Sequence, residues 1–298
     1  MIHILFGNFL KESGKLSEEQ LKKVYEEQKK VRVKLGLIAV SEKMMTIEQA
    51  DEVNNLQSTM DMRFGDIAVS KGYLTDEQVG HLLSMQGNLY LSFVQVITNE
   101  NFMTIEEVEN AYQEFQQKLN FTKTEMDRLK SGEADLLIPL FLPLNIDDYQ
   151  KEYILVAVKT LIRLIDNDLY IGKAEWKMEE TGDGVALQDI KGDADATLCF
   201  AGCGDSLLTI ANKFAGEEFE AVDADALDAC AELINCINGM FASDCSPKLF
   251  VDMLPPIYRE GSNTLCAPQI CVLPVCIKGK QVKLLSVFRG KLTIKGDN

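Results

Sequence analysis

Four residues in the C-terminal half are spaced so that a helix would place them in one line. Asp228, Glu232, Asn235 and Gly239 are four, three and four residues apart. At about 100° per residue, this spacing puts them on one face of a helix. The face presents a carboxylate and an amide with little side-chain bulk beside them, and an amide can orient a water molecule without becoming charged. Such a face suits docking against another protein.

The helix that must carry these residues is predicted from Asp225 to Ala242. Its opposite, apolar face comprises Cys230, Leu233, Ile234, Ile237, Met240 and Phe241. Any amphipathic helix has a polar face, but Glu, Lys, Arg or Gln fill a merely solvated face best. Asn and Gly inside a helix cost roughly 0.5–1 kcal/mol each relative to Ala. Asn235, Asn238 and Gly239 are therefore a poor choice for helix stability alone, which favours a functional reason for them.

The stretch from Gly216 to Gly239 closely resembles the same stretch of CheX and related CheC-type phosphatases. The motif of that family is an acidic residue or Ser, three residues, Glu, two residues and Asn. It falls here on Asp228, Glu232 and Asn235, and a downstream proline of the pattern falls at Pro255 or Pro256. Many CheC-type proteins carry two such motifs. Only one is found in this sequence, so the closer resemblance is to CheX.

The resemblance implies hydrolysis of the aspartyl phosphate on a CheY-type response-regulator receiver in chemotaxis signalling. It implies that Asn235 positions the attacking water and that Glu232 pairs with the receiver's lysine. We expect Asp228, Asn238 and Gly239 to lie at the docking surface. The receiver would supply the phosphorylated Asp and Mg²⁺, and we expect no metal or cofactor bound by this chain. The alternative is a module that binds receivers without hydrolysing anything.

The resemblance also implies a homodimer formed through sheet edges, because an exposed edge of a small sheet invites pairing. We expect the domain to span residues 147–298 and to be α+β. Helical periodicity runs from Tyr149 to Asp166, and strand-like runs include Gly172–Met178, Val185–Ile190, Ile270–Ile277 and Gln281–Phe288. Lys278, Gly279 and Lys280 predict a hairpin between the last two.

The first 130 residues contain four similar segments, which begin at Phe6, Leu35, Phe64 and Phe93, each 29 residues after the one before. A constant period of this size indicates a repeated supersecondary unit. Each unit is predicted to hold two helices, and the second starts with a capping box at Ser17/Gln20, Thr46/Gln49, Thr75/Gln78 and Thr104/Glu107. We therefore expect an all-helical domain of repeated hairpins over residues 1–130.

The third unit looks like the MshEN motif found at the front of type II secretion and pilus ATPases. In that family, tandem motifs bind cyclic di-GMP, so the resemblance implies a site formed by Arg63, Gly65, Gly72 and Gln86. The other units depart from the motif, with Leu5 and Lys34 in place of the leading Arg. The alternative is a helical scaffold in which Gly supplies a turn and Gln a cap.

Between the halves, residues 131–146 are predicted to form a connector. Its apolar run from Leu136 to Leu144 contains Pro139 and Pro143, which favour an extended chain. A connector this apolar should pack on one of the domains.

Charge and composition narrow the function classes. The net charge of −16 makes nucleic acid an unlikely partner and would repel an anionic membrane surface. The start of the chain lacks the basic and long apolar regions of a signal peptide, so we expect a cytoplasmic protein. The 8 cysteines include no CxxC pair, and we interpret them as reduced, small hydrophobic residues.

Overall fold

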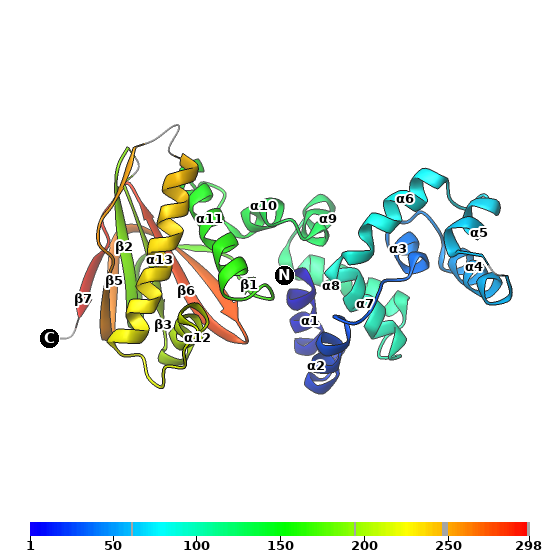
Figure 1. Ribbon diagram of the computed structural model, residues 1–298, viewed down its shortest axis with the longest axis horizontal. Coiled ribbons are helices and arrows are strands. Elements are labelled where there is room, and N and C mark those ends of the chain that lie inside the picture. The colour runs from blue at the N-terminus through cyan, green and yellow to red at the C-terminus, as the bar shows by residue number, and fades with distance from the viewer. Residues whose placement is uncertain (61, 194, 246–249, 297–298) are drawn as a thin grey trace. The chain divides into compact units, whose positions relative to one another are not determined.

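The computed structural model describes residues 1–298 except 61, 194, 246–249 and 297–298. The chain divides into two compact units, one of Ile2–Gly132 and one of Glu133–Asn298 together with Met1. The first unit is helical throughout, and the second combines helices with one sheet (Figure 1). The predicted fold class, an α+β domain preceded by an all-α domain, is confirmed.

The helical unit consists of α-helices joined by short turns, with one 3₁₀ turn, η1. Its elements are α1 (Ile2–Glu12), α2 (Glu18–Glu27), α3 (Leu35–Ser41), α4 (Ile47–Thr59), α5 (Phe64–Ser70), α6 (Asp76–Ser84), η1 (Met85–Gly87), α7 (Leu89–Asn99), α8 (Ile105–Leu119) and α9 (Lys123–Ser131). Each of the four expected capping boxes is present, and a fifth joins Thr122 to Glu125. The hydroxyl accepts from a backbone N–H three residues on, so these helices begin where the sequence predicts.

The turn between the two helices of each unit has a left-handed residue at the same place. Gly14, Lys43, Gly72 and Asn101 have φ of 69°, 57°, 73° and 54°, and they are 29 residues apart. Glycine adopts this conformation without strain, whereas Lys43 does so at a cost.

A second glycine position allows neighbouring helices of the unit to approach closely. A Cβ on Gly7 would lie 2.8 Å from the Leu21 side chain, and one on Gly65 would lie 2.7 Å from the Val79 side chain. Neither distance leaves room for a methyl group. Packing therefore explains the glycine that follows the first apolar residue in three of the four units, Gly7, Gly36 and Gly65, whereas the fourth unit has Val94 there.

The connector is not extended, contrary to our prediction. It forms α10 (Ala134–Leu137) and a 3₁₀ turn, η2 (Ile138–Phe141), before α11 (Asp148–Leu164). Pro139 lies in the first turn of η2, where its missing N–H leaves no hydrogen bond unmade. Leu137, Ile138 and Phe141 are buried, so burial of the apolar run favours the compact form.

The C-terminal unit is built on one seven-stranded sheet whose pairings are all antiparallel. The strand order is β1-β5-β6-β3-β2-β4, with β5 also pairing to β2 and to β7. The strands are β1 (Tyr170–Ile171), β2 (Glu175–Gly192), β3 (Ala196–Gly202), β4 (Val251–Met253), β5 (Ile257–Ile277), β6 (Lys280–Phe288) and β7 (Thr293–Gly296).

Strands β2 and β5 are much longer than the sequence predicts, because bulges carry each of them past residues that usually end a strand. The register shifts between Lys177 and Glu179, where three residues of β5 that include Pro268 face one residue of β2. It shifts again between Gly182 and Gly184. A bulge tolerates proline and glycine because it leaves residues out of the hydrogen-bonded ladder.

Three helices of this unit pack on the sheet, namely α11, α12 (Gly204–Ala215) and α13 (Ala224–Cys245). Helix α13 lies across the sheet and contacts β2, β3, β4 and β5 (Figure 1). It also packs on α11, where the rings of Tyr153 and Phe241 have centroids 4.6 Å apart. The sheet therefore holds α13 with one long face turned outward.

Candidate functional site

Helix α13 begins at a capping aspartate and buries the face that the sequence predicts. The carboxylate of Asp223 accepts from the backbone N–H of Ala226 at 3.0 Å. Cys230, Leu233, Ile234, Ile237 and Phe241 are buried on the sheet side. On the other side, Asp228 and Glu232 are exposed, and Asn235 and Gly239 are partly exposed. The structure thus brings four of the predicted site residues to one outward face.

Asn238 does not lie on that face, and our assignment of it to the docking surface is wrong. Its side chain is 0% exposed. It accepts from the Tyr153 hydroxyl, and its Nδ2 donates to Oε1 of Gln188 at 2.8 Å. Asn238 lies one turn beyond Ile234 and next to Ile237, so its spacing already matches the buried face.

A buried chain of hydrogen bonds links Asn238 to Asn235 through Gln188 of β2. Gln188 is 1% exposed, and its Nε2 donates to Oδ1 of Asn235 at 2.8 Å and to the carbonyl oxygen of Leu254 at 2.7 Å. Its Oε1 accepts from Asn238. Sequence analysis missed Gln188. The available signal is a polar residue inside the apolar run Val185–Ile190, where an amide requires partners.

This network fixes which end of each amide faces which partner. A backbone carbonyl can only accept, so the Nε2 of Gln188 must face Leu254, and the same nitrogen then faces Asn235. At the far end, burial raises the pKa of Tyr153 well above its ordinary value, so its hydroxyl stays protonated. If the Asn235 amide turned over, two N–H donors would face each other. Asn235 is therefore held with Oδ1 inward and Nδ2 outward.

The surroundings of Asn235 are open and partly apolar. Its Nδ2 lies 3.4 Å from Oε2 of Glu232, a long hydrogen bond between exposed groups. A Cβ on Gly239 would meet no atom within 4 Å, so packing within this chain does not require glycine there. Leu254 is 38% exposed, and its backbone N–H donates to the Asp189 carbonyl of β2 at 3.0 Å. Pro255 and Pro256 follow it directly.

Three of the four residues predicted to bind cyclic di-GMP have a structural role within the helical unit. Gly65 is buried against Val79, and Gly72 forms the left-handed turn after α5. The Oε1 of Gln86 accepts from the Arg32 guanidinium at 3.0 and 2.8 Å, and its Nε2 donates to the Val33 carbonyl at 2.8 Å. Arg63 precedes α5 and is exposed. The two glycines therefore need no ligand to explain them.

Metal-binding and membrane-spanning features were sought in the described part of the chain. Among those residues, no group of three or more His, Cys, Asp or Glu side chains is arranged to hold a metal ion. No described helix is long and apolar enough to cross a bilayer.

Comparison with known families identifies the domain. The family model of the chemotaxis phosphatase CheX matches residues 185–280, which include Gln188, α13 and Leu254. The C-terminal half is a CheX-like domain. The matching family is described as that of chemotaxis phosphatases. No curated protein matches the chain.

Solved structures similar to this half come from several bacteria. A CheC-like superfamily protein from Shewanella sp. PV-4 has 24% identity and a TM-score of 0.43, over 49% of this chain and 99% of that one. CheX from Desulfovibrio desulfuricans has 14% identity and a TM-score of 0.42, over 48% and 100%. The CheX–CheY–BeF₃–Mg²⁺ complex from Borrelia burgdorferi has 19% identity and a TM-score of 0.39, over 48% and 98%.

Proposed function

We propose that the CheX-like domain accelerates hydrolysis of the aspartyl phosphate on a CheY-type receiver. The observation that carries the proposal is the outward face of α13, on which Glu232 and Asn235 stand one turn apart inside the region that matches the CheX family. Asn235 is partly exposed, and its amide is held in one orientation by the hydrogen bond from Gln188. A fixed amide on a rigid helix is suited to positioning, which is most of what phosphoryl transfer requires.

Because Nδ2 of Asn235 points outward, this side chain can act as a hydrogen-bond donor at the surface of α13. One of its N–H groups can donate to the oxygen of a water molecule and leave the second lone pair of that oxygen free to attack phosphorus. The new bond to phosphorus forms as the bond from phosphorus to the aspartyl oxygen breaks. Both protons of the water leave on the phosphate, so the products are dihydrogen phosphate and the Asp carboxylate. The receiver contributes the phosphorylated Asp and its Mg²⁺, so this chain needs no metal of its own for the step.

Glu232 has a separate role in this proposal. Its exposed carboxylate is free to pair with a lysine of the receiver, as the family resemblance implies. Pairing would draw Oε2 away from Asn235, to which it is bound only at 3.4 Å. Docking would then free the N–H group that contacts the water.

The test is phosphate release from the host's own phosphorylated CheY-type receivers, measured with wild-type, Asn235→Ala and Glu232→Ala chains. Asn235→Ala should abolish the acceleration and leave receiver binding largely intact. Glu232→Ala should chiefly weaken binding. Wild-type protein that binds receivers but speeds phosphate loss from none would favour the alternative of a non-catalytic binding module.

A measurement of the free energy of unfolding distinguishes a loss of activity from misfolding of the variant. Asn235→Ala removes one hydrogen bond from Gln188, worth about 0.5–1.5 kcal/mol, and gains about 0.5 kcal/mol in helix propensity. We therefore expect a change of about 1 kcal/mol or less in the free energy of unfolding. An Asn235→Ala variant as active as wild type would show that the water is positioned by another residue.

A further inference from the structure

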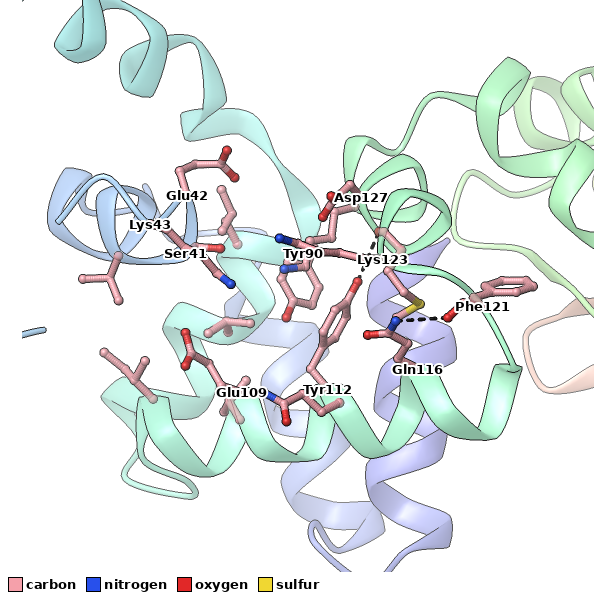
Figure 2. Close-up of a pocket in the computed structure, with 18 of the residues that line it drawn as sticks. Ser41, Glu42, Lys43, Tyr90, Glu109, Tyr112, Gln116, Phe121, Lys123 and Asp127 are labelled. Atoms are coloured by element: carbon pink, nitrogen blue, oxygen red, sulfur yellow. Dashed lines mark hydrogen bonds between the residues drawn. The ribbon is translucent and has the colours of Figure 1, made fainter. Parts of the chain in front are cut away.

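The helical unit contains a cavity of about 820 Å³ that the proposed function does not use. It is lined by the end of α3 and its turn, and by α7, α8 and α9, all of which belong to the same compact unit (Figure 2). The volume lies within the range typical of small-molecule sites. Arg63, Gly65, Gly72 and Gln86 do not line this cavity, so it is separate from the predicted cyclic di-GMP residues.

One wall of the cavity is formed by a lysine lying over two aromatic rings. The Nζ of Lys130 is 4.4 Å from the ring centroid of Tyr112 and 5.3 Å from that of Tyr90. Both tyrosines are buried, and burial raises the pKa of each above its ordinary value, so neither supplies a negative charge. The rings attract the cation through their faces, but they accept none of its three N–H bonds in the way an oxygen would.

The ammonium group of Lys130 has no hydrogen-bond or ion-pair partner among the residues that the structure describes. Burial lowers its pKa, while the carboxylates of Asp127, Glu42 and Glu109 act against that shift from a distance. Three unused donors on a partly desolvated cation favour an acceptor that carries negative charge.

We propose that this cavity binds a small flat molecule that carries one carboxylate or phosphate group. The anionic group would accept hydrogen bonds from Lys130, and the flat part would lie among Leu91, Val94, Val108 and Met126. The carboxylates of Glu42, Glu109 and Asp127 stand at the same cavity and disfavour a second negative charge on the ligand (Figure 2). Lys43 and Lys123 also line the cavity, so its three carboxylates are balanced by three cations, and one anionic group on the ligand is enough to engage the partly buried Lys130.

The test uses three probes of one shape on the full chain, with binding followed by calorimetry and by ligand-observed NMR. Indole-3-acetate is flat and anionic, 3-methylindole is flat and neutral, and tryptamine is flat and cationic. We expect indole-3-acetate to bind wild type most tightly. Lys130→Met keeps the length of the side chain and removes the charge, so it should weaken indole-3-acetate at least about tenfold and leave 3-methylindole unchanged.

Lys123→Met is the matched control, because Lys123 lines the same cavity but is exposed. It should change the affinity for indole-3-acetate less than about twofold, since exposed charges are screened. The proposal is overturned if indole-3-acetate gives no signal at millimolar concentration. It is equally overturned if tryptamine binds wild type as tightly as indole-3-acetate does, or if Lys130→Met and Lys123→Met weaken indole-3-acetate by the same factor. If circular dichroism gives Lys130→Met the same helix content as wild type, unfolding is excluded as the cause of its weaker binding.

Discussion

Gln188→Met is the change that best tests whether Asn235 is held by the buried network. Methionine keeps the length of the side chain and removes all three hydrogen bonds of the Gln188 amide. The carbonyl of Leu254 and the amide of Asn235 can turn to water, but Nδ2 of Asn238 cannot, because that side chain is 0% exposed. An unsatisfied buried donor costs about 1–3 kcal/mol, so we expect a loss of about 2–3 kcal/mol in the free energy of unfolding.

The effect on rate follows from the orientation of the amide. In the wild type, a flip of the Asn235 amide would break one hydrogen bond and place two N–H donors against each other. This costs about 2 kcal/mol, so the flipped orientation is populated at about a few per cent. In Gln188→Met both orientations and neighbouring rotamers become available. Misplacement by about 1 Å can cost up to about 100-fold in rate, so we expect kcat for receiver dephosphorylation to fall about 5–50-fold. The affinity for a receiver carrying beryllium fluoride should stay within about threefold, because Glu232 and the α13 surface are unchanged.

Gln150→Met provides a matched control. Gln150 is a buried amide of the same domain, and its Nε2 donates to the carbonyl and hydroxyl oxygens of Ser286 at 3.2 and 3.1 Å, away from Asn235. It should lose comparable stability with kcat unchanged. If both variants lower kcat equally, or Gln188→Met loses stability with full kcat, the positioning argument is refuted.

Four further predictions concern the docking face, the assembly and the helical unit. Gly239→Ala should raise the free energy of unfolding by about 0.5–1 kcal/mol in a denaturant titration, because the added Cβ meets no atom of this chain. Gly239→Trp should weaken receiver binding measured by calorimetry. Cys236 is exposed one turn beyond Glu232, so alkylation with a bulky maleimide should block receiver binding in wild type and spare Cys236→Ser. Light scattering should give a dimer, twice the chain mass of 33.3 kDa, and a monomer at tens of micromolar would contradict the edge-strand argument. If the repeats bind cyclic di-GMP, calorimetry should detect it and Arg63→Ala should abolish it, while no heat from wild type would leave a helical scaffold.

Local sequence patterns were sufficient to predict the features that depend only on residues close together in the chain. The capping boxes at Ser17, Thr46, Thr75 and Thr104 form because hydroxyl and acceptor are three residues apart. The amphipathic spacing of α13 likewise placed Glu232 and Asn235 outward. Both kinds of signal act within one or two helical turns.

Features that depend on distant residues could not be predicted in this way. The partners of Gln188 are Asn235, Asn238 and Leu254, between 47 and 66 residues away in sequence. Strand β5 continues past Pro268 because β2 faces it with a bulge there. In both cases the deciding contact comes from another strand or helix, and nothing in the local sequence identifies that neighbour.

The left-handed turn at Lys43 has a consequence for how the helical unit could change over evolutionary time. Lys43 holds φ of 57° at a position where two other units have glycine, and it also lines the cavity of α3, α7, α8 and α9. Replacing it by glycine would relieve about 1 kcal/mol of backbone strain and would remove a cation from the cavity. Because Lys43 is exposed, its charge is screened and its loss would change the affinity of the proposed anion site little, so selection for thermal tolerance would act on this one codon without a cost in ligand binding.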